Sequence, residues 1–137
     1  MHASINNMGK LAAYKKNIKK DYDKVLLVSA GDIFSGNPVV DVYKKKGYPM
    51  VDLMNKAGYK LTAIGNHEFD YGQETLAKRM KQAEFQFLCA NIDTKNTKIP
   101  QPKPYAVIKA KGKKLCFLSL IEVWNDGLPS THPAKLK

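Results

Sequence analysis

The chain has 137 residues, of which 44% are hydrophobic and 26% charged, so it is long enough for one domain with a buried core. It contains only 9 glycines and 7 prolines and no tract repeats, which excludes collagen-like, coiled-coil and disordered classes. The formal net charge is +11, but every one of the 23 cationic residues except Arg79 is a lysine. Because lysine lacks the planar guanidinium fork that reads phosphates and bases, we expect a solvated lysine-rich surface and no nucleic-acid partner.

In chain order the sequence predicts a helix over 5–20, a strand over 24–30, helical segments over 38–45 and 49–57, a strand over 61–64, a helix over 73–83 and a strand over 85–90. The run KVLLVSA (24–30) is continuously apolar, which is typical of a strand buried on both faces. No apolar run approaches the roughly 20 residues that cross a bilayer. The N-terminal segment MHASINNMGK lacks the apolar stretch of a signal peptide, so we expect a soluble chain without a membrane span.

The last third of the chain changes character after a connector rich in proline, lysine and asparagine over 94–104. Two β-rich runs, YAVIKA (105–110) and KLCFLSLIE (114–122), surround a Lys-Gly-Lys turn and predict an antiparallel hairpin. Strands that alternate with helices and then a hairpin predict an α/β fold with a mixed sheet. Cys89 and Cys116 lie inside apolar runs, which predicts buried strand thiols and no disulfide framework.

Three of the predicted strands end in short polar motifs: Gly-Asp at 31–32, Gly-Asn-His at 65–67 and Ala-Asn at 90–91. In α/β sheets, functional residues gather in the loops beyond the carboxyl ends of the strands. The coincidence therefore indicates a functional site at this edge of the sheet. Taken alone, Asp32 would more often be a turn residue or a helix N-cap.

The residue types in these motifs suit metal-assisted phosphate chemistry. The carboxylate of Asp32 can bridge two divalent cations, and the amide oxygen of Asn66 is a neutral ligand for such an ion. The imidazole of His67 can donate to a leaving oxygen or stabilise the charge of a phosphoryl group in its transition state. Asp70, three residues beyond, can accept the other ring N–H and fix the tautomer of His67. A satisfied structural histidine is the alternative interpretation of His67 alone.

The segments GDIFSGNPVVD (31–41), GNHEFDYG (65–72) and CANI (89–92) resemble the metallophosphoesterase domain of the 5′-nucleotidase family, within the calcineurin-like phosphoesterase superfamily. The similarity extends over nearly the whole chain, and the GNHEFD block is highly specific. The resemblance implies part of a four-layer α/β/β/α sandwich. It also implies hydrolysis of phosphate esters, such as nucleotides, nucleotide sugars or cyclic nucleotides, by a metal-activated hydroxide without a covalent intermediate.

The resemblance also implies roles for individual residues and two divalent metal ions, which could be zinc, manganese, iron or cobalt. Asp32 would bridge the two metals, Asn66 would bind the second, and His67 would stabilise the transferring phosphoryl group with Asp70 as its partner. The family opens with an Asp-x-His motif on the first metal, and we interpret His2 as its histidine. A functionless terminal histidine is the alternative. The family's Gly-His-x-His ligands have no counterpart here, and His132 is not assigned to metal.

We therefore expect residues 1–137 to form a partial metallophosphoesterase domain, truncated at both ends, with one sheet face uncovered and available for association. A non-catalytic remnant or binding fragment with the same fold is the first alternative. The second is a basic nucleic-acid-binding module whose patch is Lys15, Lys16, Lys19 and Lys20. The sequence assigns no substrate-binding residues. The resemblance implies that the full-length parent is exported or held at the cell surface.

Overall fold

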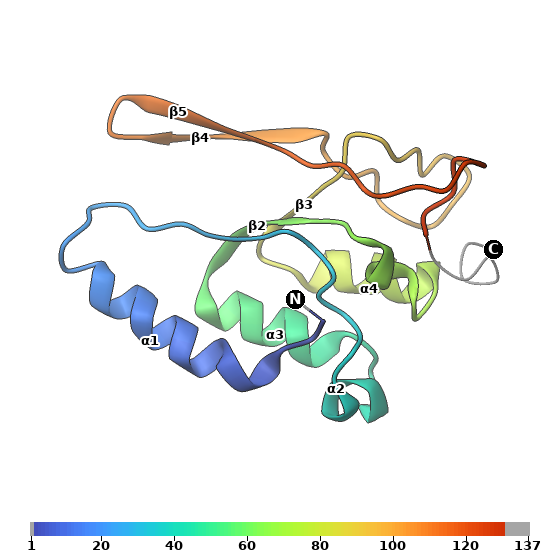
Figure 1. Ribbon diagram of the computed structural model, residues 1–137, viewed down its shortest axis with the longest axis horizontal. Coiled ribbons are helices and arrows are strands. Elements are labelled where there is room, and N and C mark those ends of the chain that lie inside the picture. Colours follow the sequence, from blue (N-terminus) through green and yellow to red (C-terminus); the bar gives the residue numbers. More distant parts are fainter. Residues whose placement is uncertain (1, 131–137) are drawn as a thin grey trace.

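The computed structural model describes residues 2–130, which form a small parallel sheet with helices on one side and an antiparallel hairpin on the other (Figure 1). In chain order the elements are η1 (Ile5–Asn7), α1 (Met8–Ile18), β1 (Leu27–Ser29), α2 (Pro38–Val42), α3 (Tyr48–Ala57), β2 (Tyr59–Ala63), η2 (Asn66–Phe69), α4 (Gln73–Gln82), β3 (Gln86–Leu88), β4 (Tyr105–Ala110) and β5 (Lys113–Leu118). The α/β fold class and the hairpin are confirmed, and β1, β3 and β5 are shorter than the runs that predicted them.

The parallel sheet has the strand order β1-β2-β3, with Val28 opposite Leu61 and Leu61 opposite Gln86. Parallel neighbours need a crossover connection, and both crossovers here are helical: α2 and α3 lead from β1 to β2, and α4 leads from β2 to β3. All three strands therefore run in the same direction. Their carboxyl ends, and the polar motifs that follow β1 and β2, lie at one edge of the sheet.

The boundaries of helix α3 agree closely with those predicted from the sequence, because a glycine stands at each end. Gly47 and Gly58 flank the helix with φ values of +70° and +72°, a left-handed conformation that other residues rarely adopt. Its buried side chains are Met50, Val51, Met54 and Ala57, which form one face of the helix. Burial of each large apolar side chain contributes about 1.5–3 kcal/mol, so this face ties the helix to the sheet.

The hydrophobic core is centred on residues that directly follow the polar motifs. Ile33 and Phe34, next to the Gly-Asp motif, are completely buried, and Phe69, next to the Gly-Asn-His motif, is 2% exposed. They pack in one cluster with the buried face of α3 and with Leu76 of α4. The loops that carry the candidate site are therefore anchored in the core and are not free surface loops.

The strands form two sheets rather than one mixed sheet, because the ladder between β3 and the hairpin does not continue. A single bridge pairs Leu88 with Lys103, and the amide of Cys89 donates to the carbonyl of Lys103 at 3.0 Å. The connector before β4 carries Pro100, Pro102 and Pro104. Proline has no amide hydrogen to donate to a ladder, so pairing does not extend beyond Lys103, which lies between Pro102 and Pro104.

Apolar side chains of β1 and of the hairpin are exposed. Val28 on β1 is 44% exposed, so the expectation of a strand buried on both faces is wrong, because an open pocket separates this face from Phe117 and Leu118 of the hairpin. Cys89 is buried, as predicted, but Cys116 on β5 is exposed. Leu118 is 65% exposed, and association through this surface stays a prediction. No helix within residues 2–130 is both long and apolar enough to cross a membrane.

Candidate metal centre and histidine site

The loops after β1 and β2 approach each other so closely that both need glycine. A Cβ atom on Gly31, whose φ is +96°, would lie 2.9 Å from the amide nitrogen of Gly65. A Cβ atom on Gly65 would lie 2.2 Å from Oδ1 of Asp32. The two glycines of the sequence motifs thus let one backbone pass against the other. As a result, the carboxylate of Asp32 lies directly over the turn that carries His67.

Asp32 is held in place from several directions. Its φ is +54°, a left-handed conformation that aspartate tolerates better than most non-glycine residues. Oδ1 of Asp32 accepts from the backbone amide of His67 at 3.3 Å, and the carbonyl of Asp32 accepts from the amide of His2 at 2.5 Å. Asp32 belongs to the loop after β1 and caps no helix within the described residues, where the N-cap of α2 is Asn37.

The buried side chain of Glu68 joins the loops after β1 and β2, a role that the sequence did not predict. Its side chain is completely buried. Oε2 accepts from the backbone amides of Asp32 at 3.0 Å and Gly65 at 2.5 Å, and Oε1 accepts from that of Ile33 at 2.5 Å. Burial raises the pKa of Glu68 to about 7, although the three amide donors oppose the shift. The only sequence signal was an acidic residue next to a core phenylalanine in the GNHEFD block.

His67 and Asp70 form a close pair on the turn after β2. Nδ1 of His67 lies 2.7 Å from Oδ2 of Asp70, and both side chains are about one-third exposed, at 31% and 32%. The spacing of three residues brings the two side chains onto the same side of the 3₁₀ turn η2. The hydroxyl of Ser35, from the loop after β1, contacts the same two atoms. The structure therefore brings together the two residues that the sequence assigned to catalysis, with Ser35 as an unforeseen third member.

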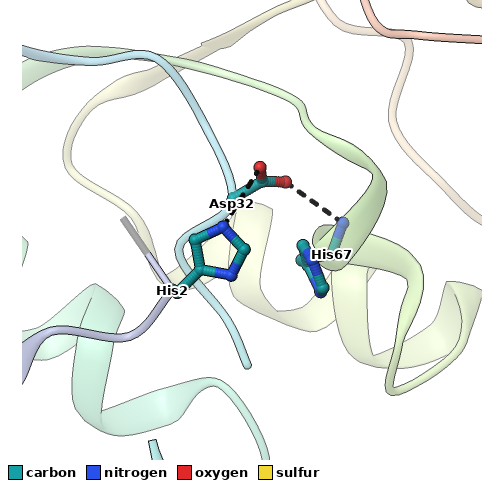
Figure 2. A group of neighbouring side chains, drawn as sticks. All are labelled: His2, Asp32 and His67. Atoms are coloured by element: carbon teal, nitrogen blue, oxygen red, sulfur yellow. Dashed lines mark hydrogen bonds and ion pairs between the residues drawn. The ribbon is translucent and has the colours of Figure 1, made fainter. Parts of the chain in front are cut away.

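A second cluster contains His2, Asp32 and His67, whose potential ligand atoms all lie within 4.8 Å of one another (Figure 2). Nε2 of His2 is 3.9 Å from Oδ2 of Asp32, and the two imidazole rings meet edge-on with centroids 4.6 Å apart. Ala3, which follows His2, is fully buried and anchors this end of the described chain. The imidazole of His2 and the carboxylate of Asp32 are donors that suit a borderline divalent cation such as zinc, whereas Nδ1 of His67 already pairs with Asp70. The residues present therefore fit one metal ion.

Asn66 and Asn91 are placed differently from each other. The side-chain nitrogen of Asn66 donates to the carbonyl of Ser130 at 2.9 Å, which sets the orientation of the amide and turns its oxygen the other way. Asn91 uses both ends of its amide on the backbone of Ile121, at 2.8 and 2.9 Å. Asn91 thus ties the end of β3 to the segment after β5, whereas the side-chain oxygen of Asn66 accepts no hydrogen bond from residues 2–130. His132 lies outside the described residues.

The lysine cluster of α1 is partly committed to structure. The ammonium group of Lys15 donates to the carbonyls of Ala57 and Gly58, both at 2.8 Å, at the end of α3. A cation at this position interacts favourably with the helix dipole. Burial lowers the pKa of Lys15, and the neighbouring charges of Lys19 and Lys60 lower it further. Lys15 therefore caps a helix and is not an open phosphate contact.

Comparisons with known proteins show which family of enzymes the chain resembles. A 2′,3′-cyclic-nucleotide 2′-phosphodiesterase/3′-nucleotidase of Haemophilus influenzae is 32% identical over 102 residues, which are 70% of this chain and 16% of that protein. A 5′-nucleotidase of Vibrio parahaemolyticus is 37% identical over 106 residues, which are 77% of this chain and 19% of that protein. The structure of the calcineurin-like phosphoesterase YfkN from Bacillus subtilis matches with a TM-score of 0.64 and 25% identity, covering 82% of this chain and 39% of that one. No protein-family model matches.

The fold is that of a calcineurin-like phosphoesterase. Within that class, the chain belongs to the 5′-nucleotidase family. The two relatives named above are hydrolases. The chain spans less than a fifth of the length of these two curated relatives.

Proposed function

We propose that this chain supplies part of the catalytic domain of a protein that hydrolyses phosphate esters with the help of divalent metal ions. The observation that carries the proposal is the juxtaposition of two groups at one edge of the sheet: the His2–Asp32–His67 donor cluster and the His67–Asp70 pair. The names of the relatives support a nucleotide or a related phosphate ester as the substrate. As part of the same proposal, the parent protein acts outside the cytoplasm.

His2 and Asp32 would hold one metal ion, and Asp32 with Asn66 would contribute to a second. The carboxylate of Asp32 faces His2 on one side and the turn of Asn66 and His67 on the other, so it is the residue that could serve both ions. When bound, the ions supply Lewis acidity, which draws negative charge from a phosphoryl group and acidifies water. The orientation of the Asn66 amide, fixed by Ser130, supports its use as an oxygen donor.

His67 would stabilise the phosphoryl group as it is transferred. With Nδ1 against Asp70, the nitrogen that remains to face a substrate is Nε2. In the protonated ring, Nε2–H would donate a hydrogen bond to an oxygen that gains charge in the transition state. Asp70 would keep the ring in this orientation throughout the reaction, because its carboxylate accepts a hydrogen bond from Nδ1–H.

Two measurements test the proposal, and they use different readouts. The first is hydrolysis of p-nitrophenyl phosphate after metal removal by a chelator and reloading with Mn²⁺ or Zn²⁺. We expect metal-dependent turnover that His67→Ala abolishes. The second is calorimetric titration with Zn²⁺, in which Asp32→Asn should weaken binding. Asp52→Asn is the matched control, because Asp52 forms an exposed pair with Lys56 on α3.

The outcomes separate the proposal from its alternative. Turnover in the wild-type chain that depends on both metal and His67 supports a working site. Metal binding without turnover under any divalent ion would show that the isolated chain is a non-catalytic fragment that keeps the ligands. If the chain shows no metal binding and no turnover, the proposal is contradicted for this chain. Screening nucleoside monophosphates and 2′,3′-cyclic nucleotides then identifies the substrate class.

A further inference from the structure

Ser35 makes the closest contact between the two loops at the histidine pair. Its hydroxyl donates a short hydrogen bond to Oδ2 of Asp70 and lies 3.0 Å from Nδ1 of His67. Ser35 is only 9% exposed, although Asp70 and His67 are each about one-third exposed. It follows Ile33 and Phe34, which are completely buried, so its position is set by the core. A buried hydroxyl thus lies against two partly exposed side chains.

Among the neutral forms of the His67 ring, the geometry allows one consistent assignment of the hydrogens. Nδ1–H of His67 and the hydroxyl of Ser35 both donate to the same carboxylate oxygen, Oδ2 of Asp70. The lone pairs of the Ser35 oxygen then face Nδ1–H as a second, weaker acceptor. A protonated carboxyl or an Nε2–H tautomer would leave one of these contacts without a hydrogen. The cluster of three therefore favours the tautomer that carries its proton on Nδ1.

The same geometry argues against a nucleophilic role for Ser35. In a serine–histidine–aspartate triad, the serine and the aspartate contact opposite nitrogens of the imidazole, so the ring passes a proton between them. Here both Ser35 and Asp70 contact Nδ1. His67 therefore cannot remove the hydroxyl proton of Ser35 through Nε2. Whatever Ser35 does for the reaction, it does through the other two side chains.

We propose that Ser35 is a positioning residue: its hydroxyl holds the carboxylate of Asp70 and the ring of His67 in one arrangement, which keeps the proton on Nδ1 and leaves Nε2 for the substrate. This inference rests on the proposed function for its catalytic consequence, but the arrangement of the three side chains does not depend on turnover. Without the hydroxyl, the partly exposed Asp70 carboxylate can turn to water, and the ring loses its single orientation.

The first test reads the tautomer directly and needs no activity. Nitrogen-15 imidazole spectra of the metal-free full chain are recorded at a pH where the ring is neutral, and the His67 signals are identified by their loss in His67→Asn. We expect the Nδ1–H form in the wild type and a mixture of tautomers in Ser35→Ala. Ser35→Thr, which keeps the hydroxyl, should restore the wild-type pattern. Ser119→Ala is the matched control, because Ser119 is 8% exposed and its hydroxyl has no hydrogen-bond partner among the described residues.

The second test is kinetic. If the proposed hydrolysis is observed, Ser35→Ala should lower kcat about tenfold with little change in KM, as for other outer partners that orient a site histidine. Ser35→Thr should recover most of kcat, and Ser119→Ala should match the wild type. If Ser35→Ala fails to fold in thermal unfolding, Ser35→Cys takes its place, since a thiol has a similar shape but donates weakly.

The outcomes are distinct from those of the proposed function. A wild-type tautomer pattern in Ser35→Ala overturns the positioning role, whether or not the chain is active. An altered pattern in Ser35→Ala, with no turnover in any variant, supports the positioning role and contradicts the proposed function alone. Equal disturbance by Ser119→Ala would show a general effect of losing a buried hydroxyl and would overturn the specific role of Ser35.

Discussion

Replacement of Glu68 by glutamine is the sharpest test of how the two site loops are held together. The carboxylate of Glu68 accepts three backbone amides, those of Asp32, Ile33 and Gly65. Glu68→Gln exchanges one of its oxygens for an NH₂ group, which cannot accept. The smallest loss of hydrogen bonds occurs if the new NH₂ group takes the place of Oε1. In that orientation only the amide of Ile33 loses its acceptor, because it then faces another donor.

The magnitude follows from the number of amides that lose their acceptor. A buried donor without a partner costs about 1–3 kcal/mol, so Glu68→Gln should lower the free energy of unfolding by about that amount. Glu68→Ala leaves three amides without acceptors and should cost about 3 kcal/mol or more. For a small protein in urea, a loss of 1–3 kcal/mol moves the unfolding midpoint by about 1 M.

The assay is urea unfolding of the metal-free chain, followed by circular dichroism. Glu84→Gln is the matched control, because Glu84 is exposed and its carboxylate does not accept the backbone amides of the loops. We expect its midpoint to stay close to that of the wild type. Equal midpoints for wild type and Glu68→Gln would refute the account of Glu68 as the joint between the loops.

The same carboxylate predicts the pH dependence of stability. The pKa of Glu68 is about 7 in the folded chain, against an ordinary value of 4.5. Between these values the folded state binds a proton that the unfolded state has released, so this contribution to stability is complete below 4.5 and is lost as the pH rises through 7. Glu68→Gln does not titrate. The difference in stability between wild type and variant should therefore shrink from acidic to alkaline pH, and a growing difference would contradict the direction of the shift.

Three further substitutions test the packing of the loops and helices. Gly65→Ala should displace the Asp32 carboxylate, because its Cβ would lie 2.2 Å from Oδ1, and Zn²⁺ affinity measured by calorimetry should fall. Gly9→Ala, where no atom lies within 4 Å of the added Cβ, should raise the thermal midpoint through a gain of up to about 1 kcal/mol in helix propensity. Lys15→Met should cost about 1 kcal/mol in urea unfolding through lost carbonyl contacts at the end of α3, whereas the exposed Lys16→Met should cost much less.

Local signals in the sequence were sufficient for the elements and for the edge of the sheet that carries the site. Helix α3 could be predicted closely because Gly58 needs a left-handed backbone and Pro49 suits a first turn. The Gly-Asp and Gly-Asn-His motifs could be placed together because parallel strands end at one edge. The partnership of His67 with Asp70 could be predicted because three residues span one 3₁₀ turn.

The exposed surfaces could not be predicted in the same way. Cys116 lies in a run as apolar as that of Cys89, yet one is exposed and the other buried. The difference depends on which elements cover each strand, and β5 pairs only with β4 among the described residues. An apolar run reports that a segment suits a strand and does not report what packs on its two faces.

By itself, the sequence determined the α/β class and the order of the elements, because short-range periodicity and glycines carry that information. From the strand ends it also predicted Asp32, Asn66, His67 and Asp70 as the candidate site, whose roles stay predictions. Only the tertiary structure decided that Glu68 joins the loops and that Ser35 completes the histidine pair. Ser35 and Asp70 are 35 residues apart, and Glu68 and Ile33 are equally distant in the chain. Such contacts arise when packing brings the ends of two neighbouring strands together, and no local pattern encodes which side chains will meet there.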